Sequence, residues 1–165
     1  MQKTVFIDRD GVVNRRLIGD WVKVWSEFEV LEGVPKAIRL LKDLGFRVVL
    51  ITNQRCLALG LIDRADLDEI HAQMNRQLEE QSGACFDDIF VCPHDRDDGC
   101  DCRKPRPGMF LQAVCKYPDI ELSQCVMFGD SDSDEGAAQA AGCKGFYRID
   151  ESKSLFDQVK VYLDL

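Results

Sequence analysis

The sequence predicts an α/β fold: one doubly wound, Rossmann-like parallel sheet with helices on both faces. Short apolar runs rich in β-formers alternate with helical patterns along the whole chain. The runs are nearly continuous in hydrophobicity, as strands buried on both faces are. The chain has 165 residues, 45% of them hydrophobic and 30% charged, which is enough for one core and argues against disorder. We therefore expect a single domain over residues 1–165.

Five strands and five helices are predicted. The strands are expected at residues 4–7, 47–51, 88–91, 126–128 and 145–149. Helix ends are indicated by a first-turn proline, a capping aspartate or a terminal glycine. These signals place helices between Pro35 and Gly45, between Asp63 and Gly83, from Pro107, over 137–141 and over about 152–163.

The charge balance limits the partners of the chain. The formal net charge is −8, and a field of that sign repels nucleic acid and anionic lipid. No apolar run approaches the roughly 18 residues of a membrane span, and the N-terminus leads into a strand rather than a signal peptide. We expect a cytoplasmic monomer that acts on a small molecule and binds neither nucleic acid nor a membrane.

Carboxylates stand at the ends of two predicted strands, where sites form in open parallel sheets. Asp8 and Asp10 follow the first strand, and their mutual repulsion must be offset by a cation. Asp130, after the fourth strand, can complete a hard oxygen site that suits Mg²⁺. A carboxylate neutralised in this way can attack phosphorus while its neighbour protonates the leaving oxygen. Either segment alone is more simply a solvated turn, but their coincidence at successive strand ends favours catalysis.

Polar groups that suit a phosphate stand at the end of the second strand and beyond the third. Thr52 and Asn53 can bind phosphoryl oxygens, and Lys104 can supply a fixed positive charge.

As a set, these segments resemble the motifs of the haloacid dehalogenase (HAD) superfamily of phosphohydrolases. The matching segments are Asp8-Arg9-Asp10-Gly11-Val12-Val13-Asn14, Thr52-Asn53-Gln54, Arg103-Lys104-Pro105, and Gly129-Asp130 with Asp134. They occur in the family's order and span nearly the whole chain. The resemblance implies a Rossmann-like sheet and phosphatase activity.

The resemblance also implies roles for individual residues. Asp8 would be the nucleophile and Asp10 the general acid/base. Mg²⁺ would be held by Asp8, the backbone carbonyl of Asp10, and Asp130, with Asp134 supporting the site. The residues that would bind the phosphoryl group are Thr52, Asn53 and Lys104.

Three of the eight cysteines are grouped around one histidine, and this group predicts a zinc-binding loop. The ligands would be Cys92, His94, Cys100 and Cys102. Three thiolates and one imidazole suit tetrahedral Zn²⁺, and a set without an open position is structural. The alternatives are an idle loop or a disulfide, but Cys100 and Cys102 are too close for an unstrained bridge. The zinc would also fix Arg103 and Lys104, which follow Cys102 directly.

The zinc loop and the following Arg103–Met109 resemble the heptose bisphosphate phosphatases. These capless members of the superfamily remove the 7-phosphate of D-glycero-D-manno-heptose 1,7-bisphosphate during synthesis of bacterial surface heptose. Histidinol-phosphate phosphatases share the zinc loop and are the alternative. Arg103 and Arg106 are candidates for a second anionic group on the substrate.

Two segments depart from this family's pattern. Segment 55–60 reads Arg-Cys-Leu-Ala-Leu-Gly, with Leu59 where the family has arginine, and Arg15–Trp25 lacks the usual acidic and tyrosine residues. Arg55 either restores the lost charge or is simply exposed. Both segments are expected to contact substrate, so the departures concern its identity rather than the reaction.

Two other functions are compatible with the motifs. One is a zinc-stabilised binding module without turnover, against which the presence of Asp10 argues, because a pure binder has no need of a general acid. The other is phosphoryl transfer to an alcohol instead of water.

Overall fold

The computed structural model describes residues 2–165 and confirms the doubly wound parallel sheet. The strands are β1 (Thr4–Ile7), β2 (Arg47–Asn53), β3 (Asp88–Cys92), β4 (Val126–Gly129) and β5 (Gly145–Arg148). All neighbours pair in parallel, in the order β3-β2-β1-β4-β5. The chain moves outward from β1 to β3 and then returns to the other side of β1. The order therefore reverses between β1 and β4, where ligand sites form in such sheets.

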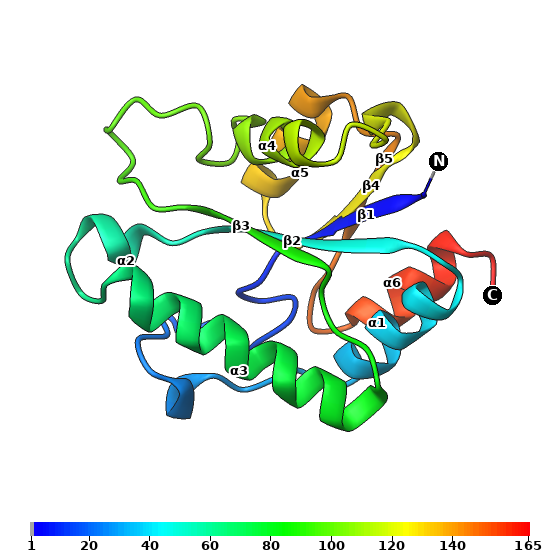
Figure 1. Ribbon diagram of the computed structural model, residues 1–165, viewed down its shortest axis with the longest axis horizontal. Coiled ribbons are helices and arrows are strands. Elements are labelled where there is room, and N and C mark those ends of the chain that lie inside the picture. The colour runs from blue at the N-terminus through cyan, green and yellow to red at the C-terminus, as the bar shows by residue number, and fades with distance from the viewer. Residues whose placement is uncertain (1) are drawn as a thin grey trace.

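Helices cover both faces of the sheet (Figure 1). One face carries α1 (Val34–Asp43), α3 (Arg64–Ser82) and α6 (Leu155–Tyr162), and the other carries α4 (Gly108–Lys116) and α5 (Asp132–Ala141). The short helix α2 (Arg55–Ala58) follows β2 at the carboxyl edge. Within residues 2–165 no cap domain is inserted between these elements, as the sequence predicts.

Side chains alternate along the central strand and so divide the core into two layers. Val5 and Ile7 belong to the cluster that contains Ile38 of α1 and Ile70 of α3, whereas Phe6 packs in the cluster of α4 and α5. This alternation follows from the two-residue repeat of a strand. The same alternation determines on which side of the sheet the residues after β1 lie.

Several predicted boundaries are wrong, and each error has a local cause. The second strand extends to Asn53 because it continues to pair with β3, and α2 was not predicted. The alanine-rich helix begins at Asp132, because Ser131 caps it and accepts a hydrogen bond from the Asp134 N–H. Asp134 is therefore a buried helical residue rather than part of a solvated loop. The last helix is shorter than predicted because its cap is Ser154.

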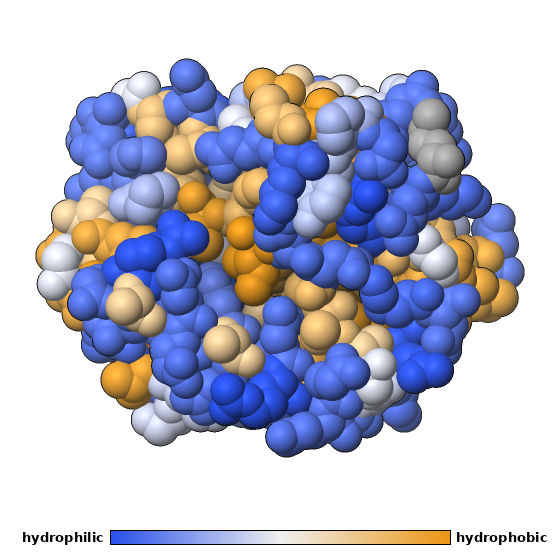
Figure 2. All heavy atoms as spheres, viewed as in Figure 1, coloured by the Kyte–Doolittle hydropathy of each residue, from blue (hydrophilic) through white to orange (hydrophobic). Residues whose placement is uncertain are grey.

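The face of the molecule in Figure 2 is mainly hydrophilic, with a hydrophobic patch near its centre between hydrophilic side chains. In the same view in Figure 1 this patch lies over β3, an edge strand that is partly exposed over its first three residues. None of the helices in residues 2–165 combines the length and the apolarity of a membrane span.

Candidate active site

Carboxylates from three elements meet beyond the carboxyl edge of the sheet. Asp8 follows β1, Asp130 follows β4 and Asp134 lies in the first turn of α5, and their oxygens lie within 4.8 Å of one another. The Asp8 N–H donates to the Phe128 carbonyl over 3.0 Å, which continues the pairing of β1 with β4. The carboxylates after the first and fourth strands thus meet, as their position at one sheet edge predicts.

The buried ammonium of Lys104 balances this negative charge. Its Nζ lies 2.6 Å from Oδ1 of Asp8 and 2.7 Å from Oδ1 of Asp134, and it donates to the Ile51 carbonyl over 3.1 Å. An ammonium has three donors, so all three are used within the protein. The two carboxylates raise the pKa of Lys104 to about 12 against the opposing effect of burial.

Asp134 has little capacity left for another ligand. Its Oδ1 contacts Lys104, and its Oδ2 accepts from the N–H groups of Asp130 (3.1 Å) and Ser131 (3.3 Å). Gly129 permits this arrangement, because a Cβ there would lie 2.6 Å from the Cβ of Asp134. These contacts suit a support for the site better than a metal ligand. Asp8 is different: burial raises its pKa well above the ordinary value, and Lys104 only partly opposes this.

The Asp10 carboxylate lies outside this group and is held by neutral and cationic donors. Oδ1 accepts from Arg9 (2.8 Å) and Asn14 (3.0 Å), and Oδ2 accepts from Gln54 (2.9 Å). Burial tends to raise the pKa of Asp10, but Arg9 and these hydrogen bonds outweigh it and lower the pKa. In the absence of substrate Asp10 is therefore a fixed carboxylate.

Arg9 supports Asp10 in this site, and the sequence reasoning did not single it out. Strand alternation sends it into the layer of α3, where it is fully buried, donates to Nε2 of His71 over 3.1 Å and lies over the Phe28 ring. Burial and the adjacent guanidinium lower the pKa of His71 to about 3, so the imidazole stays neutral and accepts. The sequence signal that could have identified Arg9 is its position: it is a charged residue between Asp8 and Asp10 at the end of a buried strand.

Thr52 and Asn53 both lie at this edge but differ in what they offer. Gln54 donates to Oγ1 of Thr52 over 2.9 Å, which leaves the buried hydroxyl proton free to donate. The Asn53 side chain instead brackets the backbone of Lys104, accepting from its N–H (3.0 Å) and donating to its carbonyl (3.2 Å). Asn53 thus fixes the position of Lys104.

The donor set fits a magnesium ion. Asp8 and Asp130 provide hard oxygens that are close together and partly or fully buried, and magnesium prefers such ligands. The carbonyl of Asp10 faces the same place, because Arg16 Nη2 contacts both this carbonyl (3.3 Å) and Oδ1 of Asp130 (3.1 Å). The residues that could hold the ion are therefore Asp8, Asp130 and the main chain of Asp10.

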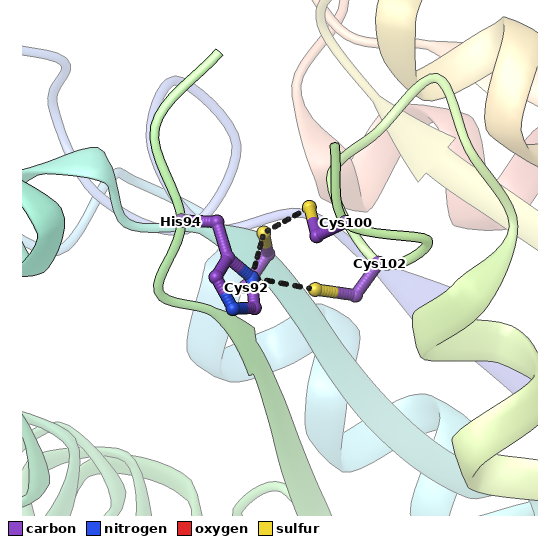
Figure 3. Close-up of side chains that lie close together, drawn as sticks. All are labelled: Cys92, His94, Cys100 and Cys102. Carbon is purple, nitrogen blue, oxygen red and sulfur yellow. Dashed lines mark hydrogen bonds between the residues drawn. The ribbon is translucent and has the colours of Figure 1, made fainter. Parts of the chain in front are cut away.

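The four predicted ligands of the cysteine-rich loop converge as expected (Figure 3). Cys92 Sγ lies 3.8 Å from Cys100 Sγ and 3.7 Å from Nδ1 of His94, and that nitrogen lies 3.2 Å from Cys102 Sγ. Two sulfurs bound tetrahedrally at zinc–sulfur distances lie about 3.8 Å apart. All eight cysteines are free thiols, so the disulfide alternative is not realised.

The three arginines near this loop lie in different environments. Arg55 is not simply exposed: it is half-buried and pairs with Asp95 of the loop at 2.5 Å, which joins segment 55–60 to the cysteine cluster. Arg103 is half-buried, and its Nη1 is enclosed without a hydrogen-bond partner among the described residues. Arg106 is exposed.

We predict that Lys104→Met destabilises the fold by about 3–5 kcal/mol, because it leaves Asp8 and Asp134 buried without their cation. The matched control is Lys116→Met, which removes an exposed partner of Asp88 and should cost at most about 1 kcal/mol. Urea unfolding of both variants measures the difference. Equal losses would show that the buried ammonium has no special role in stability.

We predict that His71 makes the fold less stable in acid. In the unfolded chain its pKa is near 6.5, whereas in the fold it is about 3, so the unfolded state binds more protons between these values. Its contribution to the free energy of unfolding should fall by about 2 kcal/mol from pH 7 to pH 5. Urea unfolding at both pH values should show that the free energy of unfolding of His71→Gln falls by about 2 kcal/mol less than that of wild type. The same decrease in both proteins would contradict the prediction.

Comparisons with known proteins identify the family of this chain. The family model of haloacid dehalogenase-like hydrolases matches residues 4–142. The D-glycero-alpha-D-manno-heptose-1,7-bisphosphate 7-phosphatase of Mycobacterium tuberculosis is 38% identical over 157 residues, 93% of this chain and 82% of that protein. The D-glycero-beta-D-manno-heptose-1,7-bisphosphate 7-phosphatase of Bordetella bronchiseptica is 46% identical over 141 residues, 86% of this chain and 77% of that protein.

A solved structure is similar over the whole fold. The crystal structure of the D,D-heptose 1,7-bisphosphate phosphatase from B. bronchiseptica, complexed with magnesium and phosphate, superposes with a TM-score of 0.89 at 38% identity. The match covers 99% of each chain. The chain therefore belongs to the haloacid dehalogenase-like hydrolases, and its place among their phosphatases confirms the resemblance that the four motifs carry.

Proposed function

We propose that this chain is a magnesium-dependent phosphomonoesterase that removes the 7-phosphate of D-glycero-D-manno-heptose 1,7-bisphosphate through an aspartyl-phosphate intermediate. The observation that carries the proposal is the meeting of Asp8, Asp130 and Asp134 within 4.8 Å beside the ammonium of Lys104. The substrate class is supported by relatives of that name that match most of this chain.

Asp8 is the proposed nucleophile. Lys104 contacts its Oδ1, so Oδ2 is the oxygen not engaged by the ammonium. Attack of a carboxylate oxygen on phosphorus forms the aspartyl phosphate and releases the sugar oxygen. Water then attacks the same phosphorus and returns Asp8 as a carboxylate.

Asp10 is the proposed general acid and base. Its lowered pKa makes it a base in the free protein, but a phosphate dianion entering beside it is a like charge that raises the pKa and favours protonation. Protonated Asp10 donates to the leaving oxygen, and the resulting carboxylate then accepts a proton from the attacking water. Arg9, Asn14 and Gln54 fix its position through both steps.

The negative charge on the phosphoryl oxygens requires hydrogen-bond donors and cations. Thr52 has a free hydroxyl proton, and Lys104 reaches a phosphoryl oxygen when that oxygen replaces one of its three acceptors. Arg103, which is half-buried and directly precedes Lys104, is the proposed partner of a second anionic group of the substrate. Magnesium, held by Asp8, Asp130 and the Asp10 carbonyl, supplies additional positive charge for the transition state.

We propose that Cys92, His94, Cys100 and Cys102 bind a structural zinc ion. Although burial opposes it, N–H donors of Arg103 and Cys102 lower the pKa of Cys100 to about 7. Burial and the neighbouring thiols raise the pKa of Cys92 and Cys102, so zinc would have to displace the protons of these two thiols. The segment 93–107 has little regular structure of its own, so four metal bonds would account for its order.

The proposed setting is the cytoplasm, as a monomer formed by one domain over residues 1–165. The proposed pathway is the synthesis of heptose for lipopolysaccharide. The net charge of −8 supports a small-molecule enzyme that binds neither nucleic acid nor an anionic membrane.

We predict magnesium-dependent release of phosphate from heptose 1,7-bisphosphate, with no turnover in Asp8→Asn and a loss of about 10²–10⁴-fold in Asp10→Asn. The matched control is Asp132→Asn, whose fully exposed carboxylate should be dispensable. The assay compares the α and β anomers, histidinol phosphate and an aryl phosphate. Faster turnover of histidinol phosphate would contradict the substrate, and turnover by Asp8→Asn would contradict the mechanism.

We predict about one zinc ion per chain by metal analysis. Cys100→Ser should lower the zinc content and the thermal stability and should slow hydrolysis indirectly, because Lys104 follows the loop. Cys115→Ser, at an exposed thiol on α4, serves as the control. If zinc-free Cys100→Ser kept the stability and activity of wild type, the proposed effect of the loop on the active site would be contradicted.

A further inference from the structure

Arg16 contacts two of the three groups that are proposed to hold magnesium. Its Nη2 lies 3.3 Å from the Asp10 carbonyl and 3.1 Å from both Oδ1 and Oδ2 of Asp130. The guanidinium therefore donates to oxygen lone pairs of Asp10 and Asp130 that a bound magnesium ion would also need. Arg16 stands in the segment that departs from the family's pattern.

The contact is one that Arg16 can exchange. Its side chain is 53% exposed, whereas that of Asp130 is only 17% exposed. Ion pairs with an exposed partner are weak, and a divalent cation competes well for a carboxylate and a carbonyl. Arg16 would then be released beside the ion without movement of the main chain.

Arg16 is the cation of this surface that an incoming phosphoryl group would meet once magnesium displaces the guanidinium from Asp130. Arg16, Gly11 and Asp130 line an open cavity of about 1090 Å³, so substrate can reach the site from this side. The other arginine of the cavity, Arg15, is already paired with Glu29 at 2.8 and 3.0 Å. The remaining charged side chains of the lining are acidic: Asp20, Glu32, Asp150 and Glu151.

We propose that Arg16 holds Asp130 and the Asp10 carbonyl until magnesium arrives and then binds the phosphoryl group that is transferred. The inference rests on the proposed function, because it assumes that Asp8, Asp130 and Asp10 hold the ion. A guanidinium suits this exchange, since its planar donors match a carboxylate and a phosphate equally well. Substrate binding then replaces the ion pair that magnesium breaks.

This exchange predicts two effects of opposite sign when Arg16 is removed. Without Arg16, magnesium no longer competes for its ligands and binds more tightly. Phosphate, in contrast, loses a charged partner and binds more weakly to the magnesium-loaded protein. A residue with a merely structural role would weaken both.

Isothermal titration calorimetry of wild type, Arg16→Met and Arg15→Met tests both effects. Arg15→Met is the matched control, because it removes the same charge from the neighbouring position. Magnesium should bind Arg16→Met about fivefold more tightly in phosphate-free buffer. Inorganic phosphate should bind that variant about tenfold more weakly at saturating magnesium. The control should resemble wild type in both titrations.

The outcomes separate the inference from the proposed function. Equal magnesium affinity in Arg16→Met and wild type, or an equal increase in Arg15→Met, would overturn the inference alone. Unchanged phosphate affinity in Arg16→Met would also overturn it. Absence of magnesium binding in all three proteins would contradict the proposed function as well.

Discussion

The buried ammonium of Lys104 is the interaction on which the rest of the site depends. Asp8 and Asp134 come from different elements, and neither can be buried as a carboxylate without a cation. Asn53 fixes the main chain of Lys104 from both sides, so the charge is placed by β2 as well as by its own loop. The proposed nucleophile Asp8, the supporting carboxylate of Asp134 and the loops that carry them are thus joined through one nitrogen atom.

The alternation of the first strand separates two kinds of chemistry. Phe6 points into the layer of α4 and α5, and two residues later Asp8 meets Lys104 and the carboxylates beyond β4. Arg9 enters the opposite layer, where neutral His71 accepts from it and where it fixes Asp10. The two carboxylates proposed for attack and for proton transfer therefore have separate supports, and the pKa of Asp10 is lowered while that of Asp8 is raised.

The sequence was sufficient for the five strands and for the meeting of Asp8 with Asp130, because apolar runs and the position of a residue at a strand end can be recognised locally. It was also sufficient for the convergence of Cys92, His94, Cys100 and Cys102, because these residues are close together in the sequence. It could not show that Asn53 binds Lys104 rather than a ligand, because that contact joins residues 51 positions apart. Helix α2 was not predicted because its four residues are too few to show a helical periodicity.

The pair of Arg55 and Asp95 has an evolutionary consequence. It connects segment 55–60, which departs from the family's pattern, to the cysteine-rich loop. A change of either segment alone leaves an unmatched charge, so the effects of such changes are not additive. Recognition loops on this scaffold should therefore diversify jointly, and transplanting one of them from a relative would carry an epistatic cost that the other loop determines.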